Sequence, residues 1–260
     1  MTDRVPLIAG NWKMNLDHLQ AIALIQKVAW TLKDADHDYS KCEVAVFPPF
    51  TDLRSAQTLI EAEKFEVVLG AQDLSKNDSG AFTGEISGAF LSKLSVKYVL
   101  IGHSERRQYH GETDEVVRDK VKAAWRNKLI PIICVGETLE ELESQGQSAV
   151  PIAQTLAALS GHEKLGEFVI AYEPVWAIGT GKVATAEEAA TVAGAIRGAL
   201  EKEFGAEAAN SRILYGGSVK ANNVAGFLQS DEVDGVLVGG ASLDADEFSG
   251  ICRFQKHIVL

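Results

Sequence analysis

The chain has 260 residues, of which 46% are hydrophobic and 23% are charged, and it contains 23 glycines and 6 prolines. This composition is typical of a folded, soluble protein and excludes a collagen-like or largely disordered chain. The formal net charge of -11 argues against a surface for nucleic acid or an anionic membrane, because both need a positive field. An anionic ligand must therefore be held by local donors.

The sequence opens without a basic segment followed by an apolar stretch, and no apolar run reaches the length of a membrane span. We therefore expect a cytoplasmic protein. The three cysteines, Cys42, Cys134 and Cys252, are odd in number and far apart. This distribution favours reduced thiols in the core over a disulfide framework or a metal site.

Short apolar runs recur about every 30 residues, with helical patterns between most of them. Eight runs are predicted strands: Val5–Asn11, Glu43–Phe47, Glu66–Ala71, Tyr98–Gly102, Ile130–Val135, Phe168–Tyr172, Arg212–Tyr215 and Gly235–Val238. Both faces of each run are apolar, as parallel strands require. This spacing favours a (β/α)₈ barrel over a doubly wound open sheet, which would give a similar pattern. No linker divides the chain, so residues 1–260 are predicted to form one domain.

Two of the helical patterns are long. The segment Leu16–Leu32 carries apolar residues predicted to share one face: Leu19, Ile22, Ala23, Ile25 and Ala29. The segment Thr185–Phe204 does the same with a second set: Ala189, Val192, Ala193, Ile196 and Leu200. Thr185, with Glu188 three residues later, predicts a capping box that opens the second helix.

The segment Ala171–Lys182 reads Ala-Tyr-Glu-Pro-Val-Trp-Ala-Ile-Gly-Thr-Gly-Lys. A strand delivers one carboxylate, Glu173, into a loop that begins with a proline and ends with glycines. Trp176 offers apolar bulk that could cover a site, and glycines permit the backbone angles of a hinge or a close phosphate contact. We interpret Glu173 as a general base at the mouth of a movable lid. The glycines after it formally fit a dinucleotide fingerprint, but the residues between strand and first glycine argue against that alternative.

Other strand ends carry polar residues. The first ends in Asn11-Trp12-Lys13, and Lys13 could anchor an anion or be an ordinary solvated lysine. The fourth ends before His103 and leads into a predicted helical turn, whose dipole would favour a neutral imidazole. Glu105 could pair with Lys13 or with neighbouring arginines, or form a surface ion pair.

The last two predicted strands end in glycine pairs, Gly216-Gly217 and Gly239-Gly240. We expect each pair to precede a helix, so that two adjacent helix N-termini form a phosphate cradle. Either pair alone would be weak, because turns use glycine everywhere.

Taken together, these motifs resemble the triosephosphate isomerase family over essentially the whole chain. The matching segments are Ala9–Asn15, Ile101–Arg107, Ala171–Lys182, Tyr215–Val219 and Leu237–Ser242. The resemblance implies a cytoplasmic, homodimeric barrel enzyme of glycolysis and gluconeogenesis. Such an enzyme interconverts dihydroxyacetone phosphate and D-glyceraldehyde 3-phosphate through a cis-enediolate, with neither metal nor organic cofactor.

The resemblance also implies roles for matching positions. Glu173 is the base, and neutral His103 polarises the carbonyl and shuttles protons between the two oxygens. Lys13 and Asn11 stabilise the developing oxyanion. Substrate or phosphate contacts fall on Asn11, Lys13, Gly179, Ser218, Gly239 and Gly240. Glu105 and Cys134 lie behind these residues, although a small buried thiol that only packs explains Cys134 better.

The closing lid of the family matches Pro174–Ala184. Its members include Pro174, Trp176, Ile178, Gly179, Thr180, Gly181, Lys182 and Ala184. Closure would exclude water, protecting the intermediate and raising the basicity of the base. The segment Asp73–Ser87 resembles the loop that inserts into a partner subunit. The expected dimer contacts are Met14, Phe82, Thr83, Gly84 and Glu85, although this loop could instead fold back on its own barrel.

The sequence departs from the family pattern at two positions. Met14 stands where some members have cysteine, and Leu16 replaces a frequent glycine. Two alternative functions remain. An aldolase of phosphosugars would share the glycine cradle but usually needs a Schiff-base lysine inside the barrel, and the predicted strands offer none. A barrel retained only for binding would predict a damaged site, whereas every matched catalytic position is intact.

Overall fold

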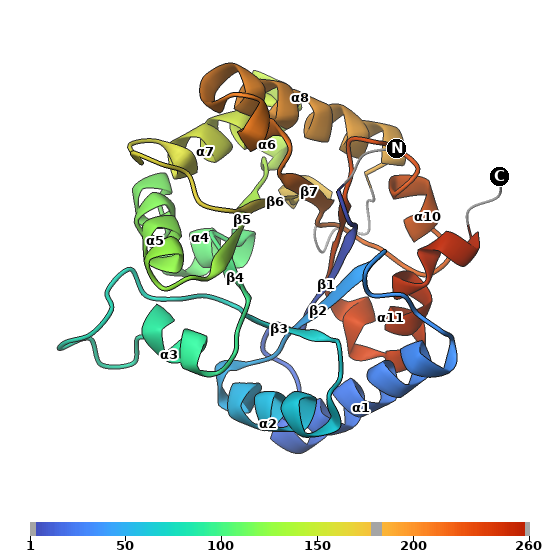
Figure 1. Ribbon diagram of the computed structural model, residues 1–260. Coiled ribbons are helices and arrows are strands. Elements are labelled where there is room, and N and C mark those ends of the chain that lie inside the picture. The colour runs from blue at the N-terminus through green and yellow to red at the C-terminus, as the bar shows by residue number, and fades with distance from the viewer. Residues whose placement is uncertain (1–3, 178–183, 258–260) are drawn as a thin grey trace.

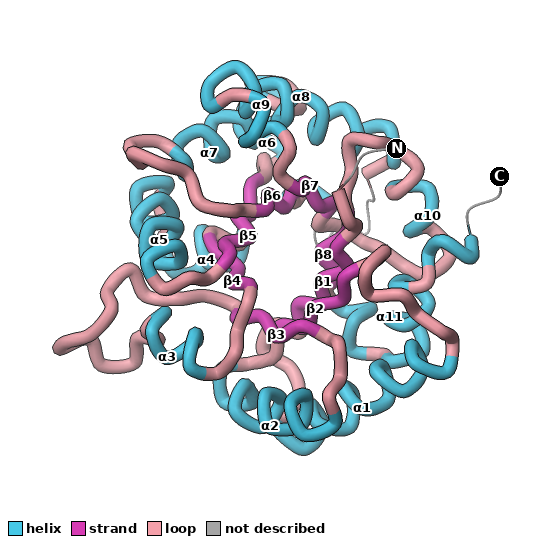
Figure 2. The backbone as a smooth tube through the Cα atoms, in the orientation of Figure 1, coloured by secondary structure: helices cyan, strands magenta, loops and turns pink. Residues whose placement is uncertain are grey.

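The computed structural model describes residues 4–177 and 184–257. Eight parallel strands close into a barrel in sequence order, and Figure 2 shows them as a central ring. The strands are β1 (Leu7–Asn11), β2 (Glu43–Phe47), β3 (Val68–Ala71), β4 (Tyr98–Ile101), β5 (Ile130–Val135), β6 (Val169–Tyr172), β7 (Arg212–Tyr215) and β8 (Gly235–Val238). Every predicted strand is present, and closure of β8 onto β1 confirms the barrel over the open sheet.

Helices surround this ring (Figure 1). They are α1 (His18–Asp34), α2 (Leu53–Glu63), α3 (Gly88–Lys93), α4 (Ser104–His110), α5 (Asp114–Arg126), α6 (Leu139–Gln145), α7 (Ala149–Leu159), α8 (Ala186–Phe204), α9 (Ala206–Ala209), α10 (Val224–Phe227) and α11 (Ala245–Cys252). Short 3₁₀ turns, η1 (Phe50–Asp52), η2 (Val175–Ala177), η3 (Gly240–Leu243) and η4 (Phe254–His257), join some of them. Within the described ranges, no helix has the length and apolar character needed to cross a membrane.

The predicted buried face agrees with the structure in one of the two long helices and only partly in the other. In α8 the buried residues are the five predicted, and the capping box of Thr185 and Glu188 is present. In α1 the predicted face is right only in part, because Ile25 and Ala29 are buried but Leu19 is 65% exposed and Ala23 is also exposed. The buried face consists of Ala21, Leu24, Ile25, Val28, Ala29 and Leu32. This helix is apolar on more than one side, so its contacts with α2 and α11 decide which side is buried.

The core lies in two layers. One layer contains only strand residues and fills the barrel, where the Phe47 ring lies so close to Gly70 that a Cβ there would be 2.2 Å from it. The other layer lies between strands and helices and contains most of the buried apolar residues. This packing fixes the positions of the strands, and therefore the points at which the loops leave their carboxyl ends.

The connection from β1 to α1 is locally strained. Leu16 has a φ of 71°, in the left-handed region that favours glycine, and it packs partly buried against the core. Asp17 then caps α1 by accepting hydrogen bonds from the backbone N–H groups of Leu19 and Gln20. The leucine thus occupies the backbone conformation that explains why glycine is frequent here.

Candidate active site

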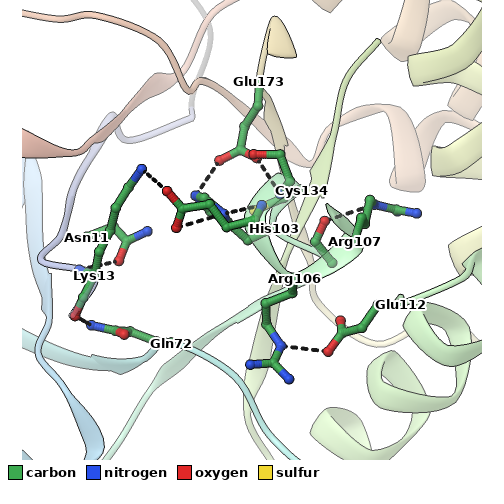
Figure 3. A network of polar contacts seen from close by, with 12 residues as sticks. Asn11, Lys13, Gln72, His103, Arg106, Arg107, Glu112, Cys134 and Glu173 are labelled. Carbon is green, nitrogen blue, oxygen red and sulfur yellow. Dashed lines mark hydrogen bonds and ion pairs between the residues drawn. The ribbon is translucent and has the colours of Figure 1, made fainter. Parts of the chain in front are cut away.

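One pocket, of about 310 Å³, lies at the carboxyl ends of the strands. Asn11 ends β1, His103 follows β4 and Glu173 directly follows β6, so the barrel brings together residues far apart in the chain (Figure 3). The predicted residues that line this pocket are Asn11, Lys13, His103, Glu173, Ser218, Gly239 and Gly240. Gly179 lies outside the described residues.

Glu173 is 3% exposed and its carboxylate is held by two donors. Its Oε1 lies 3.0 Å from Nε2 of His103, and its Oε2 accepts the backbone N–H of Ser104 at 3.1 Å. Burial alone would raise the pKa of Glu173, but the His103 ring, its hydrogen bond and the Ser104 N–H together lower the pKa below its usual value. The carboxylate is therefore ionised and positioned at neutral pH.

The backbone around Glu173 has no room for side chains. A Cβ on Gly136 would lie 1.7 Å from the carbonyl oxygen of Glu173, and one on Gly216 would lie 2.9 Å from its Cγ. The N–H of Glu173 donates to the carbonyl of Val135 at 2.7 Å, which continues the ladder between β5 and β6. Two glycines that directly follow the flanking strands β5 and β7 thus determine where this carboxylate lies.

His103 is the N-cap of α4, as the predicted helical turn requires. Its Nδ1 accepts the backbone N–H of Glu105 at 3.2 Å, so the ring proton resides on Nε2, which donates to Glu173. Burial lowers the pKa of His103, but the Glu173 carboxylate raises it more, and the net pKa is above its ordinary value. The hydrogen bond that Nδ1 accepts is that of a neutral imidazole, whereas the raised pKa, caused by Glu173, runs against the expected effect of the helix dipole.

Lys13 has a φ of 53°, which is unusual for a residue with a side chain. Its N–H donates to Asn11 Oδ1 at 3.0 Å, and its carbonyl accepts from Gln72 Nε2 at 2.7 Å. Gln72 also donates to the carbonyl of Phe47 at 2.9 Å and so links this turn to β2. The ammonium lies 2.5 Å from Glu105 Oε1, which selects the lysine pairing among those considered for Glu105.

The glycine pairs behave differently from the expectation that both precede helices. Gly239-Gly240 does so, because η3 begins at Gly240. After Gly216-Gly217 the chain forms turns, and α10 begins only at Val224. The prediction of two adjacent helix N-termini is therefore wrong for β7. An irregular turn there exposes Ser218 at the pocket instead.

The start of the predicted lid is tied to a residue that the sequence analysis missed. Glu137, fully buried after β5, accepts hydrogen bonds from Tyr172 Oη at 2.8 Å and from Trp176 Nε1 at 2.9 Å. Of the other predicted lid residues, Pro174 and Ala184 are buried. Ile178, Gly179, Thr180, Gly181 and Lys182 lie outside the described residues.

The remaining predicted residues lie away from the pocket wall. Cys134 is fully buried inside the barrel, where burial raises the pKa of its thiol well above the usual value. The long segment between β3 and α3 extends away from the barrel (Figure 1). Met14 is 95% exposed and Phe82 is 45% exposed. Thr83, Gly84 and Glu85 are exposed beside Phe82.

Two missed residues, Gln72 and Glu137, follow strands β3 and β5 closely. Both therefore stand where the rule that strand ends carry function applies. Chemically, the site combines a positioned carboxylate, a neutral N–H donor, an ammonium and glycine-rich backbone. Such a set can remove a proton next to a carbonyl of a small anionic substrate and stabilise the resulting oxyanion.

Comparisons with known proteins agree with this geometry. The model of the triosephosphate isomerase family matches residues 6–255. A relative from Leifsonia xyli subsp. xyli, named triosephosphate isomerase, is 61% identical over 98% of this chain and 99% of its own length. One of the same name from Streptomyces avermitilis is 57% identical over 99% of this chain and 100% of its own.

Among solved structures, the crystal structure of triosephosphate isomerase from Bartonella henselae has a TM-score of 0.84 and 37% identity. The match covers 96% of this chain and 99% of that one. Fold, site geometry and sequence relatives lead to one conclusion: the chain belongs to the triosephosphate isomerase family.

Proposed function

We propose that this chain is an isomerase that interconverts dihydroxyacetone phosphate and D-glyceraldehyde 3-phosphate in glycolysis and gluconeogenesis. The observation that carries the proposal is the convergence of Lys13, His103 and Glu173 on one pocket, in a chain of this family. An aldolase is not favoured, because none of the eight strands as observed contains a lysine.

Glu173 removes a proton from the carbon next to the carbonyl and returns it to the neighbouring carbon, by way of a cis-enediolate. The Nε2–H of His103 donates to the carbonyl oxygen as negative charge develops there and then shuttles the proton between the two oxygens. Lys13 and Asn11 stabilise this oxyanion. Substrate binding must displace the resting hydrogen bond between His103 and Glu173, because both groups then face the substrate.

The phosphate is held by Ser218, Gly239 and Gly240, with Gly179 as a further contact from the lid. Glycine has no Cβ, so the backbone N–H groups at the start of η3 can approach an anion closely. Glu105 orients the Lys13 ammonium. These groups supply the base, the electrophile and the anion site, so the proposed reaction needs neither a metal nor an organic cofactor.

The lid, Pro174–Ala184, is proposed to close over the substrate and exclude water. Trp176 and Glu137 hold its first turn in the conformation described. A lid matters for this chemistry because an enediolate phosphate that meets water can lose its phosphate group.

A coupled assay tests the proposed activity. Conversion of D-glyceraldehyde 3-phosphate to dihydroxyacetone phosphate would be followed with and without a phosphorylated hydroxamate that mimics the enediolate. We expect turnover that the mimic abolishes by competition. Absence of turnover, or turnover that saturating mimic leaves unchanged, would contradict the proposal.

We further propose a homodimer in the cytoplasm. A cavity of about 600 Å³ lies beside the catalytic pocket and shares Asn11, Lys13 and His103 with it. Its outer wall includes Met14 and Tyr109, both largely exposed, and the segment that carries Phe82 projects from the same chain. A second copy that inserts this segment into the cavity would bury all three apolar side chains at once.

A further inference from the structure

Glu173 lines a second cavity as well as the catalytic pocket. This rear cavity, of about 480 Å³, lies among the loops after β4, β5 and β6. Its wall includes Gly102, Ser104, Arg107, Gln108, Glu112 and Cys134. None of these six residues lines the catalytic pocket, so the base lies between two separate sets of residues.

The two carboxylate oxygens divide between these two sets. Oε1 is hydrogen-bonded to His103, which lines the catalytic pocket, whereas Oε2 accepts the N–H of Ser104, which lines the rear cavity. In Figure 3, Asn11 and Lys13 lie on one side of Glu173, and Arg107 lies on the other. One oxygen can therefore face a substrate while the other faces the rear cavity.

The rear cavity is polar and reaches the surface. Arg107 Nη2 and Glu112 Oε2 are buried and have no hydrogen-bond partner among the described residues. Buried polar groups are usually satisfied by protein or by ordered water, and this cavity exceeds the space that several waters need. Gln108 and Thr138 line the cavity and are exposed, so its rim meets bulk solvent.

We propose that the rear cavity is a solvent path to Glu173, through which the base exchanges its proton while substrate occupies the catalytic pocket. The inference rests on the proposed isomerase function. After Glu173 has taken a proton from substrate carbon, its carboxylic acid reacts with deuterated water as RCOOH + D₂O → RCOOD + HDO. The product then receives deuterium instead of the original hydrogen.

Because of this path, the fraction of substrate hydrogen that the product retains should depend on Gln108, a rim residue that touches neither the substrate nor Glu173. The fraction of original hydrogen in the product equals the rate of return divided by the sum of the rates of return and exchange. Where exchange is the faster process, a block that halves its rate raises the retained fraction about twofold. Turnover should stay nearly constant, because abstraction and return use the catalytic pocket.

The experiment places a removable block at the rim. Gln108→Cys introduces an exposed thiol, whereas Cys42, Cys134 and Cys252 are buried. The variant is assayed before and after alkylation with a bulky maleimide. Gln145→Cys, at the exposed end of α6 and outside the cavity wall, is the matched control. Isomerisation is run in D₂O with the product oxidised as it forms, and mass spectrometry gives the retained hydrogen.

We expect alkylation of Gln108→Cys to raise the retained fraction at least about twofold. The kcat should stay within about twofold of that of the unlabelled protein. The control should show no change in either quantity. Gln108→Trp, which needs no label, should act in the same direction. An unchanged retained fraction in both blocked proteins, with isomerisation intact, would overturn the solvent path but leave the proposed function standing. Absence of isomerisation in the parent protein would instead overturn the proposed function.

Discussion

Substitution of Gly216 by alanine tests how closely the backbone positions the base. A Cβ at this position would lie 2.9 Å from Glu173 Cγ and 3.2 Å from the carbonyl oxygen of Tyr172. The second contact opposes the hydrogen bond by which the Gly216 N–H donates to that carbonyl at 2.7 Å. Ordinary van der Waals contact begins near 3.4 Å, so Glu173 Cγ must move by about 0.5 Å.

The size of the effect follows from that displacement. A misplacement of about 1 Å costs about 100-fold in rate, so a movement half as large should lower kcat about tenfold. Overpacking of a buried strand end should also lower the free energy of unfolding by about 1–3 kcal/mol. KM should change little, because the proposed phosphate contacts lie on other residues.

The coupled isomerase assay gives kcat and KM, and urea unfolding at a fixed protein concentration gives the stability. Gly198→Ala in α8 is the matched control, because no atom lies within 4 Å of the added Cβ. It should stabilise the protein by about 0.5–1 kcal/mol without changing kcat. If Gly216→Ala lost stability yet kept its full kcat, the glycine would not position the base, and the reasoning would be refuted.

Three further results are expected. Lys120→Met should lower the free energy of unfolding by about 3–5 kcal/mol in urea titrations, because its buried ammonium lies 2.6 Å from the carboxylates of Asp73 and Glu112, which would be left to share Arg106; a loss under about 1 kcal/mol would contradict this. Phe82→Asp should shift the protein toward monomer in sedimentation experiments and lower its activity. If the variant remained a dimer to the same extent as the wild type, this side chain would be excluded from the interface. The pKa of Glu173 is depressed, so its contribution to stability is present above about pH 4.5 and is lost as the pH falls through the folded-state value. The free energy of unfolding of Glu173→Gln should therefore fall less steeply between about pH 5 and pH 3 than that of the wild type, and equal slopes would contradict the depressed pKa.

The fold was predictable because its signals are local. Each strand is a short apolar run, and all eight occur where predicted, since a parallel strand inside a barrel needs apolar residues on both faces. The capping box of Thr185 with Glu188 is equally local. The face of α1 was not predictable, because Leu19 and the buried Leu24 are equally apolar, and only packing distinguishes them.

The site was predictable in part for the same reason. Residues that directly follow strands, such as His103 and Glu173, must gather at one end of a barrel once it closes. The positions of Gln72 and Glu137 near strand ends were predictable, but their hydrogen-bond partners are backbone carbonyls and distant side chains, which only the folded chain brings near. The turn after Gly216 also depends on tertiary contacts, since glycine permits a helix start and an irregular turn alike.

The most direct test of the account is the turnover of Glu173→Asp with dihydroxyacetone phosphate. The substitution keeps the carboxylate but withdraws it by about 1 Å, so kcat should fall by about 100-fold or more while binding of the hydroxamate mimic changes little. Unchanged kcat in purified, folded Glu173→Asp would show that this carboxylate is not the base.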